Sequence, residues 1–182
     1  MPDTPPQLEV LIDADRIAAR VAELGAAINA AQGGEPLVVV PVLKGSFVFA
    51  ADLIRQLQMP VEVDFLGVRS YDEGTQSSGV VQITKDLGHS IEGRDVLLVE
   101  DIVDSGLTMS YLMDNLQTRH PRSVRLASLL HKPARNHIPV RIDYLGFRIE
   151  DVFVVGYGLD YNQQYRHLPD LARVTGEASR SS

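Results

Sequence analysis

The chain has 182 residues, a length typical of one globular domain, and 45% of them are hydrophobic, which excludes a chain too polar to bury a core. The absence of cysteine excludes disulfide frameworks and thiolate metal sites, and a net charge of −7 disfavours a general nucleic-acid-binding protein. No apolar run reaches the roughly 18–20 residues of a membrane helix, and the first ten residues have no signal-peptide pattern, so we expect a cytoplasmic protein without a membrane span.

In the first half of the chain, helix and strand patterns alternate. Asp13 can cap a helix that ends at Gly33 and whose apolar residues recur at helical spacing. The continuous apolar run over 37–43 is typical of a strand buried on both faces, and it leads through a short turn into a helix over 47–57. Beyond it we predict, in order, a strand over 61–65, a polar loop over 70–79 and a short strand over 80–83.

The second half repeats this alternation. A buried strand over 95–99 is followed by a helix over 107–119. Further strands are predicted over 124–130, 140–147 and 152–155. Strands that alternate with helices predict an α/β fold, an open, mostly parallel sheet flanked by helices. We expect one domain over residues 8–176, with flexible termini at 1–7 and 177–182.

The densest group of polar residues follows the strand over 95–99. Glu100, Asp101 and Asp104 lie within five residues, and a glycine turn then opens a helix. The N–H groups of such a turn and of a helix N-terminus bind phosphate, while ionised carboxylates bind sugar hydroxyls or a divalent metal. Helix capping would account for one of these polar residues, but not for three carboxylates that repel one another. The pattern therefore favours a phosphate or metal site.

The segment Glu100–Thr108, EDIVDSGLT, resembles the ribose-phosphate signature of the type I phosphoribosyltransferases, in the version found in hypoxanthine-guanine phosphoribosyltransferases. Leu43–Ser46 is similar to the family's pyrophosphate loop, and Ser70 and Tyr71 are similar to its mobile loop. Three further segments resemble the purine-binding end of the family: Lys132, residues 153–161 and residues 165–169. Each motif alone is weak, but together they are specific and span residues 37–174.

This resemblance implies both a fold and an activity. The family adds a small hood for the base to the parallel sheet. It transfers a phosphoribosyl group from 5-phosphoribosyl 1-diphosphate to a 6-oxopurine such as hypoxanthine or guanine, with Mg²⁺ as cofactor and diphosphate as the second product. The implied function is purine salvage, with the activated ribose and a purine base as ligands and a homodimer or homotetramer as the oligomeric state.

The resemblance also implies roles around the ribose. Asp104 would lie near N7 of the purine, as a general base or as an anion that faces the cationic transition state. The 5′-phosphate would be held by Asp104, Ser105, Gly106, Leu107 and Thr108. Glu100 and Asp101 would hold the ribose hydroxyls, directly or through the metal.

The remaining matches would surround the diphosphate and the base. The diphosphate would be bound by Lys44, Gly45 and Arg166, and Mg²⁺ by Glu100, Asp101 and Asp160. The base would be bound by Lys132, Phe153, Val154 and Asp160. Lys132 would donate to the 6-oxo group and so reject a 6-amino group, and Phe153 would stack on the ring. A lid loop that excludes water would begin at Arg69, Ser70 and Tyr71 and reach to about Gly88.

Alternatives remain for the whole chain and for single residues. A nucleotide-sensing regulator would keep the phosphoribosyl site and bind RNA or DNA, but it would need a basic face or an added domain, which neither the charge nor the length provides. Transfer to adenine or orotate is disfavoured because the matching position in those relatives is typically not acidic, whereas Asp104 is. Phe153 has the alternative of a core aromatic, Arg166 that of a surface ion pair, and Lys132 that of an exposed strand-end side chain.

Overall fold

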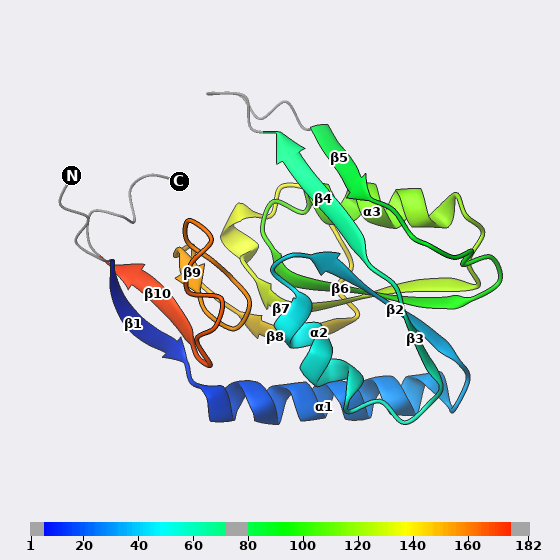
Figure 1. The fold of residues 1–182 in the computed structure, drawn as a ribbon, viewed down its shortest axis with the longest axis horizontal. Coiled ribbons are helices and arrows are strands. Elements are labelled where there is room, and N and C mark those ends of the chain that lie inside the picture. The colour runs from blue at the N-terminus through cyan, green and yellow to red at the C-terminus, as the bar shows by residue number, and fades with distance from the viewer. Residues whose placement is uncertain (1–5, 72–79, 176–182) are drawn as a thin grey trace.

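The computed structural model describes residues 6–71 and 80–175, and most of these build a seven-stranded sheet in the order β5-β4-β2-β6-β7-β8, with β3 also paired to β2 (Figure 1). Its strands are β2 (Leu37–Leu43), β3 (Val61–Val63), β4 (Leu66–Tyr71), β5 (Val80–Lys85), β6 (Asp95–Val103), β7 (Ser123–His131) and β8 (Tyr144–Arg148). Every pair is parallel except β4 with β5. The predicted open, mostly parallel sheet is confirmed.

Both faces of this sheet are buried. The helices α1 (Ala14–Gln32) and α2 (Phe47–Ile54) cover one face, and α3 (Leu107–Gln117) covers the other (Figure 1). Residues of β2 alternate between the two layers, because Val39 packs with α1 and α2 whereas Val38 and Val40 pack with α3. A strand buried on both faces needs apolar residues at every position, which is why its sequence is a continuous apolar run.

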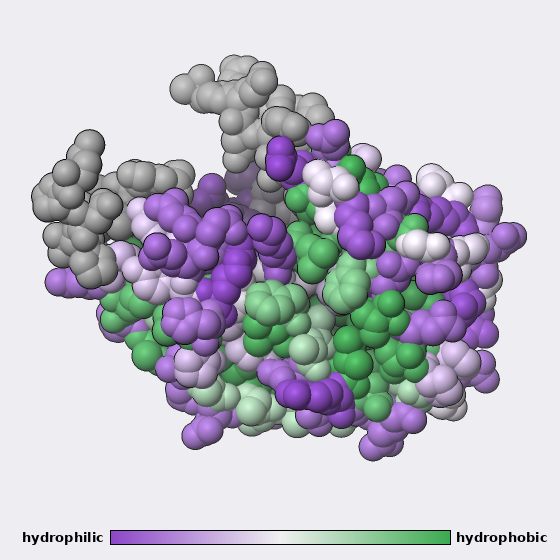
Figure 2. Space-filling model, in the orientation of Figure 1, coloured by the Kyte–Doolittle hydropathy of each residue, from purple (hydrophilic) through white to green (hydrophobic). Residues whose placement is uncertain are grey.

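The longest helix, α1, has the ends that the sequence predicts. The Asp13 carboxylate accepts a hydrogen bond from the Arg16 N–H at 2.9 Å, and Gly33 follows the last turn with a φ of 61°. Within the described part of the chain, no helix is long and apolar enough to cross a membrane. On the face shown in Figure 2, hydrophobic residues gather over α2 and the neighbouring strands. Phe47 of α2 and Val63 of β3 are exposed hydrophobic residues.

A second, three-stranded sheet forms a small hood beside the large one. Its order is β1-β10-β9, antiparallel throughout, so that the two ends of the domain lie side by side (Figure 1). The strands are β1 (Gln7–Ile12), β9 (Val154–Val155) and β10 (Leu171–Thr175). Neither β1 nor β10 was predicted from the sequence. Each is short and obtains its hydrogen bonds from a partner far away in the sequence, which a local pattern does not reveal.

Several predicted boundaries were wrong because side chains interrupt the strands. The strand expected over 61–65 ends at Val63, as β3, and the next strand, β4, begins at Leu66. Between them the Asp64 carboxylate accepts the N–H groups of Phe65 and Gly88 at 2.8 and 2.7 Å. The strand expected over 140–147 begins only at Tyr144, because Asp143 turns its carboxylate to the Leu126 N–H at 2.9 Å. The helix expected over 47–57 ends at Ile54.

The predicted start of the lid loop was also wrong. Arg69, Ser70 and Tyr71 lie in β4, where their backbone pairs with β5 in antiparallel register. Arg69 is exposed there. The rest of the predicted loop, 72–79, lies outside the described residues, as do 1–5 and 177–182 of the predicted flexible termini and residue 176 of the predicted domain. Gln7, which was predicted to be flexible, belongs to β1.

Candidate active site

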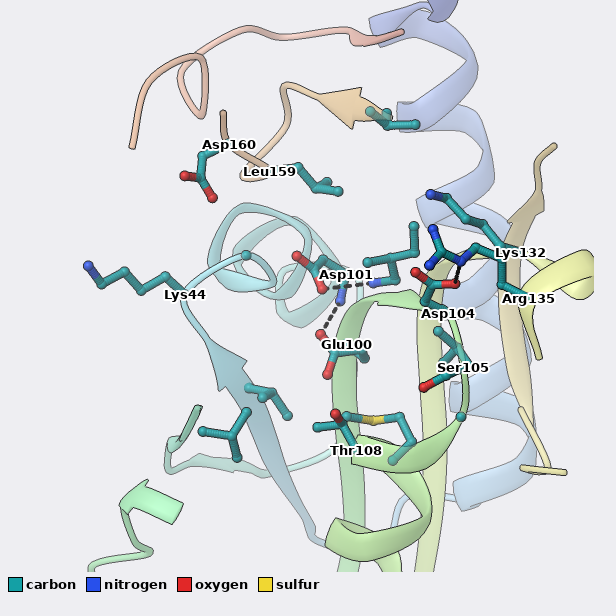
Figure 3. Close-up of a pocket in the computed structure, with 18 of the residues that line it drawn as sticks. Lys44, Glu100, Asp101, Asp104, Ser105, Thr108, Lys132, Arg135, Leu159 and Asp160 are labelled. Atoms are coloured by element: carbon teal, nitrogen blue, oxygen red, sulfur yellow. Dashed lines mark hydrogen bonds and ion pairs between the residues drawn. The ribbon is translucent and has the colours of Figure 1, made fainter. Parts of the chain in front are cut away.

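The site lies at the carboxyl ends of β2, β6 and β7. From β2 the chain continues to β3 and β4 on one side, whereas from β6 it passes through α3 to β7 on the other side. Ligands of open α/β sheets bind where the connections diverge in this way. A cavity of about 620 Å³ opens there, a size suited to a nucleotide (Figure 3).

Most of the residues singled out in the sequence line this one cavity. They are Lys44, Gly45, Glu100, Asp101, Asp104, Ser105, Gly106, Thr108, Lys132, Phe153, Val154, Asp160 and Arg166. Leu107 does not line it, and β4 reaches it through Val68 rather than Arg69, because neighbouring side chains of a strand point to opposite faces. The structure thus brings distant motifs together, while the role of each residue stays a prediction.

The turn between β6 and α3 is held in place by backbone contacts. Its carbonyl at Ser105 accepts the N–H groups of His137 and Ile138 at 3.1 and 3.0 Å. Gly106 has a φ of 87°, and a Cβ at this position would overlap the carbonyl oxygen of Ile138, so no other residue fits. Ser105 Oγ accepts the Leu107 N–H at 3.3 Å. This contact is local to the turn, because the N-cap of α3 is Gly106 and no side chain caps the helix. Helix capping therefore explains neither Ser105 nor Asp104.

Asp104 has an incompletely satisfied carboxylate. Its Oδ1 atom is buried and lacks a hydrogen-bond partner among the described residues. Arg135 Nε lies 3.3 Å from the same oxygen as an ion pair, the contact drawn as a dashed line in Figure 3. A buried acceptor of this kind is ready to receive a proton donor from a ligand.

Glu100 and Asp101 place two carboxylates side by side in the cavity. Glu100 is buried, and its Oε1 accepts the Asp101 N–H at 3.0 Å. Burial and, second, repulsion from Asp101 raise the pKa of Glu100 well above its ordinary value. The Asp101 carboxylate lies against Gly45, where a Cβ would overlap its Oδ2, so this glycine makes room for the acidic pair.

The acidic pair fits a divalent cation better than Asp160 does. Carboxylate oxygens are the ligands that Mg²⁺ takes from proteins, and a cation would relieve the repulsion between Glu100 and Asp101. Asp160 is already engaged, because Oδ1 lies 2.7 Å from Arg166 Nη2 and Oδ2 accepts the Gln163 N–H at 2.7 Å. Across the part of the chain that the structure describes, no three candidate ligand side chains converge. A water-rich Mg²⁺ needs only one or two carboxylates.

The turn after β2 contacts the loop that carries Asp160. The peptide bond between Leu43 and Lys44 is cis, and the Lys44 side chain extends away from the carboxylates (Figure 3). A Cβ at Gly158, whose φ is 103°, would overlap the carbonyl oxygen of Gly45. Arg166 Nη1 donates to the Gly158 carbonyl at 2.8 Å. Arg166 is thus both an ion-pair partner and a cavity residue, so the two interpretations of it are compatible.

Lys132 and Phe153 define the other end of the cavity. The Lys132 side chain is only 9% exposed, so the alternative of an exposed strand-end lysine is wrong. The backbone N–H of Lys132 donates to the Val103 carbonyl at 3.0 Å, which places this residue beside the acidic turn. Phe153 is half-buried and packs edge to face with Tyr161, at a centroid distance of 5.8 Å, while it also lines the cavity. Core packing and contact with the cavity coexist at Phe153.

Two charged residues of the site were missed in the sequence. Arg135 lines the cavity and pairs with Asp104, and Asp151 pairs with both Lys132 and Arg135. Neither belongs to a motif, and each lies in a polar connecting segment that reads as ordinary surface. Only their spacing from Lys132 and Phe153 along the chain could have drawn attention to them.

The model of one protein family, the phosphoribosyl transferase domain, matches residues 9–162 of this chain. The chain belongs to this family. The predicted phosphoribosyltransferase fold and enzyme class are thereby confirmed.

Relatives of this phosphoribosyltransferase carry more specific names. The hypoxanthine-guanine phosphoribosyltransferase of Mycobacterium avium is 52% identical over 165 residues, covering 87% of this chain and 81% of the relative. The hypoxanthine phosphoribosyltransferase of Salmonella typhimurium is 47% identical over 169 residues, covering 92% and 95%. The solved structure of a hypoxanthine phosphoribosyltransferase from Staphylococcus aureus is similar with a TM-score of 0.90 and 44% identity, covering 93% of this chain and 92% of its own.

Proposed function

We propose that this phosphoribosyltransferase transfers the phosphoribosyl group of 5-phosphoribosyl 1-diphosphate to N9 of hypoxanthine, and also of guanine. The products are the purine nucleotide and diphosphate, and the reaction serves purine salvage. One observation carries the proposal: the acidic phosphate turn and the Lys132–Phe153 end line a single cavity. The named relatives support the same choice of base. No finding favours the nucleotide-sensing regulator.

The proposed mechanism divides the work among residues of the cavity. Backbone N–H groups of the turn at Ser105 and Gly106 bind the 5′-phosphate at the start of α3. As the bond from C1′ to the diphosphate oxygen breaks, C1′ becomes positively charged, and the fixed negative charge at Asp101 stabilises it. The bond from N9 to C1′ forms on the other side. Asp104 accepts the proton that the purine loses, and Arg166 binds the departing diphosphate.

The proposal includes Mg²⁺, a cytoplasmic location and a homodimer or homotetramer. Glu100 and Asp101 would hold the Mg²⁺, which when bound would neutralise charge on the diphosphate. Asp160 would join them only where Arg166 turns to the diphosphate. The location follows from the phosphorylated substrates, which are cytoplasmic metabolites. A similar structure, of a Trypanosoma cruzi enzyme, is described in terms of how its C-terminal region affects oligomeric state and activity.

Nucleotide formation tests the function directly. The protein is incubated with Mg²⁺, 5-phosphoribosyl 1-diphosphate and, in separate reactions, hypoxanthine, guanine, xanthine or adenine. We expect nucleotide from hypoxanthine and guanine and none from adenine. Absence of nucleotide with every purine would contradict the proposal, and efficient use of adenine would contradict the assigned base.

Lys132→Ala tests the base end of the cavity. We expect the ratio of kcat/KM for 6-oxopurines over 6-aminopurines to fall by at least tenfold, because a charged donor to O6 is worth about 1.5–3 kcal/mol. Lys85→Ala is the control, since Lys85 is a half-exposed lysine that does not line the cavity. An unchanged ratio in Lys132→Ala would leave the lysine with a packing role only.

A further inference from the structure

Asp151 lies between two cations of the site. Its Oδ1 atom is 3.6 Å from Lys132 Nζ and 3.6 Å from Arg135 Nη1. The residue is in the connection between β8 and β9, outside every motif identified in the sequence. Lys132 precedes the short 3-10 turn Pro133–Arg135 that follows β7 and Arg135 ends it, and one carboxylate that pairs with both holds the positions of both cations.

Lys132 depends on this carboxylate because its side chain is withdrawn from water. Only 9% of the side chain is exposed, and an ammonium group removed from solvent needs a counter-charge. Among the described residues, Asp151 is the one carboxylate within 4.0 Å of Lys132 Nζ. The position of the Asp151 carboxylate therefore determines the direction in which the Lys132 ammonium points.

Asp151 also belongs to the segment that presents Phe153 to the cavity. The Phe153 carbonyl accepts the Val174 N–H at 2.9 Å, and its ring packs against Tyr161, so the segment is anchored to the hood. The ion pair to Lys132 consequently connects the hood to the end of β7. It fixes the separation between the ring that stacks on a base and the ammonium that faces its edge.

Arg135 holds Asp151 from the other side and continues the network to Asp104. Figure 3 shows Lys132, Arg135 and Asp104 converging on one part of the cavity, with Arg135 Nε 3.3 Å from Asp104 Oδ1. Charges alternate along the series Lys132, Asp151, Arg135 and Asp104. Arg135 and Asp151 are each about half exposed, so either pair alone would be weak, but a network loses less side-chain entropy for each contact.

We propose that Asp151 is a positioning residue that sets the preference for a 6-oxo group by aiming the Lys132 ammonium at the base. The inference deepens the proposed function and rests on it. It assigns no direct contact between Asp151 and the substrate. Its effect is confined to ligands that carry an oxygen at C6.

Calorimetric binding of two nucleotides to the full-length protein tests this assignment. Inosine 5′-monophosphate carries the 6-oxygen, and purine riboside 5′-monophosphate lacks it. For Asp151→Asn we expect the Kd of the first to rise about tenfold and that of the second to stay within twofold, because only the first uses the aimed donor. Asp151→Glu, which keeps the charge, is expected to recover most of the affinity. Glu150→Gln is the control, since Glu150 is an exposed neighbour without an ion pair among the described residues.

A second background separates positioning from general damage. In Lys132→Met protein, adding Asp151→Asn should change neither Kd further, because the group that Asp151 aims is gone. The assignment is overturned if Asp151→Asn weakens both nucleotides equally, if it weakens neither, or if its effect persists without Lys132. If wild-type protein binds neither nucleotide, the proposed function itself has failed. If the wild type prefers inosine 5′-monophosphate and Asp151→Asn keeps the same preference, only the role assigned to Asp151 has failed.

Discussion

The carboxylates of the cavity differ in what surrounds each of them. Glu100 is buried beside Asp101 and has no ion-pair partner among the described residues. Asp104 has an unsatisfied oxygen next to Arg135, and Asp160 is already paired with Arg166. Identical functional groups in different surroundings carry out different chemistry. The acidic pair suits a cation or hydroxyls, and the unsatisfied oxygen suits a ligand proton.

Asp104→Ala is expected to lower kcat by at least 10²-fold, because the general base or fixed anion would be lost. Melting temperature should stay close to that of the wild type, since the described hydrogen bonds give this carboxylate no role in the start of α3. Steady-state kinetics and a thermal melt are the two measurements. Asp114→Ala on the exposed side of α3 is the matched control, and turnover near the wild-type value in Asp104→Ala would remove the catalytic assignment.

Glu100→Gln is expected to stabilise the ligand-free fold at neutral pH. The pKa of Glu100 is raised by burial and by Asp101, so its ionised form costs stability above the unfolded pKa, about 4.3. The advantage of the variant should therefore be absent near pH 4 and grow as the pH rises to 7. Thermal melts across this range give the answer. If the variant gains about 1 kcal/mol in the free energy of unfolding, its melting temperature rises by roughly 2–4 °C. A lower melting temperature of the variant at pH 7 would contradict the burial of a charged Glu100 as the cause.

Between elements, a polar network ties α1 to the sheet at the end opposite the cavity. Asp95 at the start of β6 accepts hydrogen bonds from Gln32 Nε2 at 2.8 Å, Arg122 Nε at 3.0 Å and Ser123 Oγ at 2.7 Å. The hydrogen bonds from Arg122, above all, hold the pKa of Asp95 well below its ordinary value. The last turn of α1, β6 and β7 are thereby joined through one carboxylate.

Asp95→Asn is expected to lower the free energy of unfolding by about 1–3 kcal/mol at pH 7. The loss is smaller than for a fully buried ion pair, because the Arg122 side chain is half exposed to solvent. The pKa of Asp95 is lower in the folded protein than in the unfolded chain, where it is about 3.9. The ionised carboxylate therefore stabilises the fold above the unfolded pKa, and this stabilisation is lost as the pH falls through the folded pKa. The difference between wild type and variant should accordingly shrink below pH 4. Denaturant unfolding measures it, with Glu92→Gln at an exposed position as the control. A constant difference down to pH 2 would exclude the ionised carboxylate as the cause.

Elements with a strong local pattern were predictable, and those made by distant pairing were not. The apolar run of β2 and the capped, amphipathic α1 were foreseen within a residue or two. β1 and β10 were missed, because they are stabilised by each other across the length of the chain. The break at Asp64 was missed as well, since the N–H of Gly88 that it accepts comes from a distant turn.

In the whole molecule, the cavity exists only because three strand ends and the hood meet. β2, β6 and β7 supply the turns, and the loop that follows β9 of the hood is held to α2 by the Tyr157 hydroxyl, which donates to Asp52 Oδ2 at 2.6 Å. A ligand that fills the cavity contacts all of these parts at once. Binding should therefore stabilise the entire fold, since the unfolded chain has no such site.

Inosine 5′-monophosphate at about 100 times its Kd is expected to add roughly 2.7 kcal/mol to the free energy of unfolding, or about 5–11 °C in melting temperature. Inosine at the same concentration should add much less, because the turn at Gly106 offers its N–H groups to a phosphate. A thermal shift series with both compounds measures this. Equal shifts for nucleotide and nucleoside would place the phosphate outside the turn.

The sequence by itself determined the fold class and the residue types of the site, because burial on two faces, helix capping and the acidic turn are local properties written in consecutive residues. It also determined that these motifs follow successive strands, which placed most of them at one edge. Tertiary structure alone decided that Lys132 is buried rather than exposed, that Asp160 is engaged by Arg166, and that Arg135 and Asp151 join the site. Those facts depend on distances between side chains from separate elements, and only the packing of the sheet against the hood sets such distances.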